Sequence, residues 1–158
     1  MNMRRLALLA ICLIAMPFVA DAQRSEQLLE RGWRFTREDS ADFKNVGYDD
    51  SAWQEVVVPH DWAIYGPFSI HNDQQNVAIT QDGQHEAMEH AGRTGGLPFV
   101  GVGWYRLDFE IEDFDEGRCA TLIFDGAMSQ ARVFVNGVEV GFWPYGYNSF
   151  HFDVTPYV

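Results

Sequence analysis

The sequence predicts an all-β fold, an antiparallel β-sandwich of the jelly-roll type. Several short segments alternate apolar and polar side chains with the period of two that a β-strand has, most clearly residues 103–112. Clusters of Gly, Pro, Asn and Asp separate these segments, as they do in sandwiches. Residues 133–142 form two alternating runs joined by Asn136-Gly137, and this dipeptide predicts a hairpin because a type I′ turn needs positive φ at both central residues.

The first 22 residues have the composition of a secretory signal peptide. Two arginines precede an apolar run from Leu6 to Val19, which is short for a bilayer span, and Ala20-Asp21-Ala22 is a small-x-small cleavage pattern. We therefore expect cleavage before Gln23, one mature domain over residues 23–158, and a secreted or periplasmic location.

The acidic composition argues against two classes of partner. The chain has 23 Asp and Glu against 11 Lys and Arg, a formal net charge of −12. Nucleic acids and anionic membrane surfaces select clusters of basic side chains, so neither is an expected partner. Cys119 is the one cysteine of the mature domain, which excludes an internal disulfide, and its apolar neighbours predict a small buried core residue.

At the mature N-terminus, Ser25–Arg31 is expected to start a short helix with Ser25 as its N-cap and Gly32 at its end. Trp33 and Phe35 alternate with polar residues, which predicts a strand.

A polar loop is expected over residues 39–45. In residues 49–53 we expect a tight turn whose aspartates accept from backbone amides while Trp53 folds back as a plug. Residues 54–58 end in three β-branched valines and predict a short strand, which Pro59 ends.

Residues 59–101 show little periodicity, and an irregular segment of this length in a compact domain is uncommon unless it is functional or disordered. Three histidines lie in it, but their spacings of 14 and 5 match no standard metal pattern, so solvated loop histidines are favoured. No Cys/His cluster has zinc spacing and no phosphate-binding glycine loop occurs, so we predict neither a metal nor a cofactor. The histidines are His71, His85 and His90.

The adjacent pair His60-Asp61 resembles part of a catalytic triad. Neighbouring residues of an extended chain point to opposite faces, and no serine lies in a nucleophile elbow. A structural corner is favoured, in which Asp61 binds backbone amides and Trp62 is buried. Arg93 is expected to be a surface arginine, with pairing to a substrate carboxylate or to a carboxylate at a domain interface as the alternative.

Gly103–Glu112 is the clearest predicted strand, with one apolar and one largely polar face, as in an antiparallel sheet packed on one side. Strands are also expected over Arg118–Phe124 and Ser149–Val154. In the hairpin, the three apolar residues after the turn are expected to share one face; they are Val138, Val140 and Phe142.

An ordered series of short motifs resembles the N-terminal sugar-binding domain of glycoside hydrolase family 2, with an order and spacing similar to secreted bacterial β-galactosidases. Single motifs are weak signals, whereas the ordered set, which covers nearly all of the mature chain, is strong. The motifs are Pro59-His-Asp-Trp62, Gly66-Pro-Phe-Ser69, Thr94-Gly-Gly-Leu-Pro98, Gly101-Val-Gly-Trp-Tyr-Arg106, Phe124-Asp-Gly126, Val135-Asn-Gly137, Gly141, Gly146-Tyr147 and Phe152-Asp-Val-Thr155.

The resemblance implies retaining hydrolysis of a terminal β-linked sugar, foremost a β-galactoside, by two glutamates about 5–5.5 Å apart. In the family these lie in a TIM barrel that follows an immunoglobulin-like domain. No glutamate of this chain matches them, so no catalytic residue is assigned. The domain is expected to shape the pocket, to pack against the barrel or another subunit of a homo-oligomer, and to be inactive alone.

The resemblance further implies one more strand after Phe152-Asp-Val-Thr155, so we expect this chain to lack the final strand of its sandwich. An unpaired edge of this kind favours association of the isolated chain.

The aromatic loop after the hairpin is the candidate sugar contact. Trp143, Tyr145 and Tyr147 are expected to form a stacking wall for a sugar ring. The alternative is that Tyr147 packs inside the sandwich while the other two contact the barrel. In other family members an acid of this loop helps to hold a cation; Tyr145 stands near its place, and no cation site is carried over.

Two other functions remain open. One is a free-standing carbohydrate-binding module. The other is a piece of a β-glucuronidase or β-mannosidase, which only barrel residues distinguish from a β-galactosidase.

Overall fold

The structure, a computed structural model, describes residues 24–90, 98–111, 114 and 117–158. The predicted signal peptide and Arg93 lie outside these residues. The described part contains nine strands and five short 3-10 helices. The strands are β1 Trp33–Thr36, β2 Gln54–Val56, β3 Asn76–Val77, β4 Met88–Glu89, β5 Trp104–Arg106, β6 Thr121–Phe124, β7 Ala131–Val135, β8 Val138–Trp143 and β9 Phe150–Asp153. The 3-10 helices are η1 Ala41–Lys44, η2 Ala63–Tyr65, η3 Ile70–Asn72, η4 Thr80–Asp82 and η5 Thr155–Tyr157.

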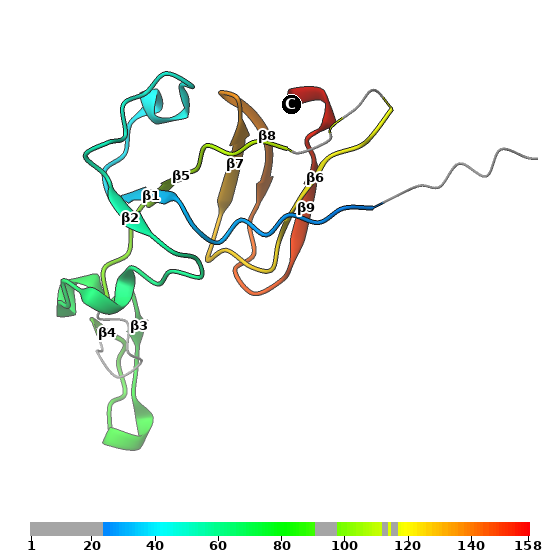
Figure 1. The fold of residues 1–158 in the computed structure, drawn as a ribbon. Coiled ribbons are helices and arrows are strands. Elements are labelled where there is room, and N and C mark those ends of the chain that lie inside the picture. The colour runs from blue at the N-terminus through cyan, green and yellow to red at the C-terminus, as the bar shows by residue number, and fades with distance from the viewer. Residues whose placement is uncertain (1–23, 91–97, 112–113, 115–116) are drawn as a thin grey trace, which may run out of the picture.

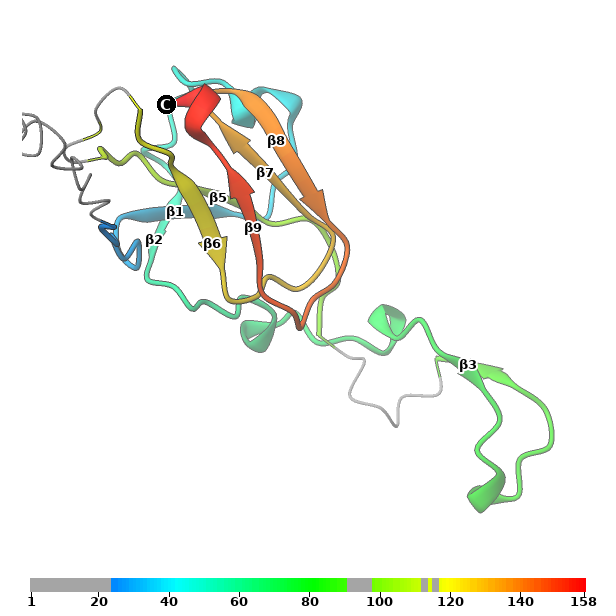
Figure 2. The ribbon, with the colours of Figure 1, turned by 90° about the vertical axis from the view of Figure 1, so that its right-hand side faces the viewer.

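All strand pairs of the described residues are antiparallel, which confirms the predicted all-β class. β1 pairs with β2 and β5, β6 with β9, β7 with β8, and β3 with β4. Figure 2 shows β6, β9 and β8 side by side with β1 and β5 behind them, the two layers of a sandwich. The β3–β4 pair projects from this body as an arm, which Figure 1 shows in green.

Aromatic rings from both layers make the core. In one layer, Phe35 is 4% exposed and its ring centroid lies 4.8 Å from that of Tyr105. In the other, Phe150 is 4% exposed and stacks on Phe124, its partner in the β6–β9 register. Rings bury a large apolar area on a pleated surface, which explains the high aromatic content.

The segment 24–30 is not helical, so the prediction for Ser25–Arg31 is wrong. Tertiary contacts use its carbonyl groups: the indole of Trp33 donates to the oxygen of Leu29 at 2.8 Å, and Val58 N donates to the oxygen of Glu30 at 3.0 Å. A helix of this length is marginal without such competition.

The predicted turn at residues 49–53 is confirmed. Asp49 Oδ1 accepts from Ser51 N at 3.0 Å. Hydrogen bonding to the Ser51 side chain, and next to its backbone N–H, lowers the pKa of Asp49. Trp53 is 9% exposed and meets Phe43 edge-on at 4.8 Å. The loop expected over residues 39–45 contains η1, which Ser40 caps by accepting from Asp42 N.

The strand predicted over Gly103–Glu112 is shorter in the structure. β5 covers only Trp104–Arg106, and residues 107–111 have no strand partner among the described residues. Alternation predicts which side chains share a face, but pairing needs a neighbouring strand.

Cys119 is exposed, so its predicted burial is wrong. The residue lies before β6, which begins only at Thr121, whereas the prediction placed it inside a strand that began at Arg118.

Thr155 and Val154 join the end of β9 to the start of β6. Val154 is 1% exposed and its N–H donates to Ala120 O at 2.8 Å. Thr155 Oγ1 accepts from Ala120 N at 2.9 Å, while Asp153 Oδ1 accepts from Thr155 N at 3.0 Å. Hydrogen bonding of the Asp153 carboxylate to the Thr155 side chain, and next to the Thr155 N–H, lowers the pKa of Asp153.

The predicted hairpin is confirmed, with positive φ at Asn136 (49°) and Gly137 (82°). A register shift follows: Phe134 pairs with Glu139, but Val133 pairs with Gly141, so Val140 is an extra residue in β8. This bulge reverses the alternation beyond it.

The bulge makes the expected face of Val138, Val140 and Phe142 wrong. Phe142 is 44% exposed, with the guanidinium of Arg132 5.2 Å from its ring centroid. Trp143, one residue later, turns toward Phe150 and stacks on it at 5.5 Å.

Replacing Gly141 tests the packing at the bulge. An added Cβ would lie 2.1 Å from the ring of Phe152, so Gly141→Ala forces β8 and β9 apart. We expect it to lower the free energy of unfolding by about 1–3 kcal/mol, measured by urea unfolding. The control is Gly47→Ala, whose Cβ meets nothing within 4 Å. Equal urea midpoints for the two variants would contradict the close approach of Gly141 to Phe152.

Candidate functional site

Two loops lie together at one end of the sandwich, as Figure 1 shows below β6–β9 and β7–β8. Residues 125–130 connect β6 to β7, and residues 144–149 connect β8 to β9. Gln130 N donates to Pro144 O at 3.3 Å. At Gly146 the backbones approach so closely that a Cβ would lie 2.6 Å from the sulfur and 3.4 Å from the Cα of Met128. We call these two segments the aromatic loop pair.

The three predicted sugar-binding residues differ in environment. Trp143 is half-buried and stacks on Phe150, so it forms the base of the loop. Tyr145 is 63% exposed and meets the Trp143 ring edge-on at 5.8 Å. Tyr147 is 87% exposed, so the alternative that it packs inside the sandwich is wrong. Sugar contact by these residues stays a prediction.

The geometry of the loop pair suits contact rather than chemistry. Exposed tyrosine rings offer an apolar face together with a hydroxyl group. Asp125 is the one carboxylate in the two loops. Retaining glycoside hydrolysis needs two carboxyl groups about 5–5.5 Å apart, so the loops do not provide a catalytic pair.

The sequence of residues 125–130 contains no motif that would predict a role for Met128. It is 67% exposed and lies against Gly146. Only the approach of the two loops shows that it borders the same surface as Tyr145 and Tyr147.

The His60-Asp61-Trp62 motif is a structural corner, as predicted. His60 Nδ1 lies 2.9 Å from the hydroxyl oxygen of Tyr105, and Asp61 Oδ1 accepts from Ala63 N at 3.0 Å. Trp62 is half-buried rather than buried, with the guanidinium carbon of Arg37 5.1 Å from its ring centroid. Burial, and next the negative charge of Asp61, raise the pKa of Tyr105 to about 12.

A shallow groove of about 510 Å³ lies elsewhere, between residues 27–31 and 107–110. None of the predicted sugar-binding residues lines it. Its walls are two extended segments that lack strand partners in the described part of the chain. We therefore place the candidate site at the aromatic loop pair.

Two broader features bear on function. Among the described residues, no group of three or more His, Cys, Asp or Glu side chains could hold a metal ion. The described helices also include none with the length and apolar character needed to span a bilayer.

Comparison with known families decides the classification. The family described as "Glycosyl hydrolases family 2, sugar binding domain" matches residues 27–158. The chain belongs to this family. The predicted resemblance is therefore confirmed, and it includes both loops of the aromatic loop pair.

Relatives of this family 2 domain are larger enzymes. A β-galactosidase of Bacteroides ovatus, BoGH2A, is 36% identical over 89% of this chain and 14% of its own length. A putative β-glucuronidase of Formosa agariphila is 32% identical over 97% of this chain and 13% of its own length.

Solved structures of glycosidases are also similar to this chain. A family 2 glycosyl hydrolase of Bacteroides cellulosilyticus is 31% identical, with a TM-score of 0.66 over 84% of this chain and 16% of its own. A β-glycosidase of Bacteroides vulgatus is 27% identical, with a TM-score of 0.66 over 82% of this chain and 15% of its own. The chain thus spans about a seventh of the length of these relatives.

The raised pKa of Tyr105 predicts a pH dependence of stability. The phenol of the unfolded chain loses its proton near pH 10, whereas folded Tyr105 keeps it until about 12. Its contribution to stability is therefore complete below pH 10 and is lost as the pH rises to about 12.

We expect Tyr105→Phe to flatten this alkaline fall in the free energy of unfolding, measured by urea unfolding across that range. Tyr147→Phe, which removes an exposed hydroxyl group, is the control and should keep the wild-type slope. An unchanged slope in Tyr105→Phe would refute the assignment.

Proposed function

We propose that this chain is the N-terminal domain of a secreted, retaining glycoside hydrolase that releases terminal β-linked sugars, foremost β-galactosides, in carbohydrate breakdown. The observation that carries the proposal is the family match across residues 27–158. A β-galactosidase is favoured by the motif order and by the 36% identical relative. A β-glucuronidase is the second candidate, because a putative enzyme of that kind is 32% identical.

The role proposed for the domain is to form one wall of the substrate pocket. Tyr145 and Tyr147 have the exposure that stacking on a sugar ring requires, and the Tyr145 ring packs edge-on against Trp143, which itself stacks on Phe150. Cation–π contacts of exposed aromatic rings contribute about 0.5–1 kcal/mol each, and we expect a similar contribution from each tyrosine here. The catalytic carboxylates would come from the barrel of the full-length enzyme, so the domain alone would be inactive.

An exposed apolar patch supports docking against the barrel or another subunit. Four large apolar side chains of residues 64–70 are more than half exposed, which is unusual for a surface that remains in water. They lie on η2, on η3 and between them: Ile64, Tyr65, Phe68 and Ile70, exposed by 56%, 76%, 60% and 52%. A homo-oligomeric full-length enzyme is one arrangement that would cover this patch.

Export is proposed from residues 1–22 alone. Mass spectrometry of the protein recovered outside the cytoplasm should find a mature N-terminus at Gln23. An uncleaved N-terminus would overturn this part of the proposal.

The full-length enzyme tests the reaction. With nitrophenyl β-galactoside, β-glucuronide and β-mannoside as substrates, we expect turnover of the β-galactoside with retention of the anomeric configuration, followed by NMR. The isolated 158-residue chain should turn over none of them.

Preference for the β-glucuronide would overturn the proposed sugar specificity but not the reaction class. Inversion of the anomeric configuration would overturn the retaining mechanism. A stop codon directly after Val158, together with galactoside binding by the isolated chain, would favour a free-standing carbohydrate-binding module instead.

Variants of the two exposed tyrosines test the pocket wall in the full-length enzyme. Tyr145→Ala and Tyr147→Ala should each raise KM by roughly two- to fivefold through the loss of about 0.5–1 kcal/mol of stacking. Tyr145→Phe and Tyr147→Phe keep the ring and should keep most of the affinity. Because both side chains are exposed, the alanine variants should unfold at the wild-type urea concentration, and unchanged KM values would exclude these residues from the wall.

A further inference from the structure

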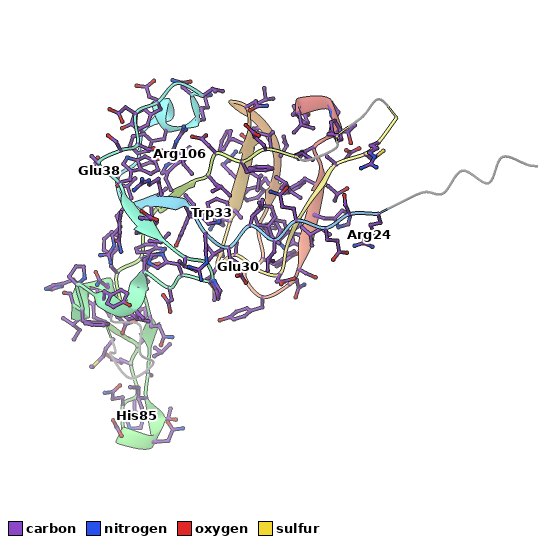
Figure 3. All side chains as sticks on the ribbon, viewed as in Figure 1. Arg24, Glu30, Trp33, Glu38, His85 and Arg106 are labelled. Atoms are coloured by element: carbon purple, nitrogen blue, oxygen red, sulfur yellow. The ribbon has the colours of Figure 1, made fainter. Side chains whose placement is uncertain are left out.

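Two histidine rings from separate segments meet at the base of the β3–β4 arm. His71 lies in η3, before β3, and His90 directly follows β4. Their ring centroids are 5.6 Å apart and the rings are nearly perpendicular, at 85°. The third histidine of this region, His85, lies at the far tip of the arm, as Figure 3 shows.

The hydrogen bond of His90 determines which ring nitrogen carries the proton. His90 Nδ1 lies 2.6 Å from the backbone oxygen of Asp73. A carbonyl oxygen only accepts, so Nδ1 donates, and in the neutral ring Nε2 keeps its lone pair. Metal-binding histidines are typically oriented in this way, with the second nitrogen donating to a carbonyl or carboxylate.

His90 is also held by its backbone. Its φ is 53°, a left-handed conformation that side chains other than glycine seldom adopt. The His90 N–H donates to Gln75 O at 3.0 Å. Asp73 O and Gln75 O, the two acceptors, belong to one turn. The side chain of Asp73 stabilises this turn: the residue is 1% exposed, and its Oδ1 accepts from Gln75 N at 2.9 Å. The neighbouring contacts thus determine the position of this ring against its local preference.

His71 is positioned by the 3-10 turn that contains it. Ser69 Oγ accepts from His71 N at 3.2 Å and caps η3. Asp73 N donates to Ile70 O at 3.1 Å and closes the turn. Both imidazoles are therefore carried by hydrogen-bonded backbone.

We propose that His71 and His90 together bind one divalent transition-metal ion, such as Zn²⁺, and so clamp the base of the arm. Imidazole nitrogen suits Zn²⁺, Cu²⁺ and Ni²⁺. With metal–nitrogen distances of about 2.0–2.1 Å, an ion shared by both rings would lie roughly 3.2 Å from each centroid. A centroid separation of 5.6 Å matches one shared ion, at a centroid–ion–centroid angle of about 120°, when a nitrogen of each ring faces the ion.

The ligand count indicates an exchangeable ion. Within the described residues, no third His, Cys, Asp or Glu completes the group, so water would fill the other positions. Closed structural zinc sites use four protein ligands. The site therefore takes up an ion from solution without being required for folding, and the bound ion stabilises the arm because it binds the folded form preferentially.

Calorimetric titration of the untagged chain with ZnCl₂ near neutral pH tests the proposal. We expect one ion per chain. His71→Ala and His90→Ala should each weaken binding by about 10-fold or more, which is the scale of losing even an indirect partner of a ligand. His85→Ala is the matched control, since it removes a histidine of the same arm away from the pair, and it should bind as the wild type does.

No binding by the wild-type chain, or equal losses in all three variants, would overturn the proposal. A second measurement needs no substitution: Zn²⁺ should protect His71 and His90, but not His85, from acylation by diethyl pyrocarbonate, followed by mass spectrometry. Equal labelling of all three histidines with and without the ion would also count against the site.

Discussion

The stacking of Phe150 on its neighbours is the contact on which the candidate site depends. Phe150 is 4% exposed, and its ring stacks with Phe124 at 4.8 Å and with Trp143 at 5.5 Å. Phe124 is its partner across the β6–β9 register, whereas Trp143 ends β8. One buried ring therefore joins two strand pairs and fixes both ends of the loop over residues 144–149. The exposed rings of that loop, Tyr145 and Tyr147, are presented from a packed base.

The bulge in β8 makes this arrangement possible. In a regular strand without the bulge at Val140, Phe142 would face the core and Trp143 would face away from it. With it, Trp143 turns inward and Phe142 turns outward onto Arg132. Gly141 has no side chain where the Phe152 ring passes, so the bulge also lets β8 and β9 pack closely. The hairpin thus contributes to stability and to the exposed aromatic surface through the same local irregularity.

The loop end of the sandwich and the β3–β4 arm are stabilised in different ways. The sandwich end carries aromatic side chains on loops that are packed from behind, and it has the shape of a contact surface. The β3–β4 arm is held chiefly by hydrogen bonds around Asp73, His90 and Gln75 rather than by a buried apolar core. The sandwich end therefore provides the proposed pocket wall, and the arm provides the proposed metal-ion site.

Local chemistry determined what the sequence predicted correctly. The Asn136-Gly137 turn, the aspartate turn at residues 49–53 and the alternating strand at Phe150–Asp153 depend on nearest neighbours, and the ordered motifs identified the family. Tertiary structure decided what depends on distant partners. The carbonyls of Leu29 and Glu30 meet donors outside their own segment, so the expected helix is absent. The exposure of Tyr147 and the contact of His71 with His90 likewise follow from how separate segments meet. Periodicity in a sequence specifies a face of a strand, whereas burial and side-chain contacts require the other segments to be in place.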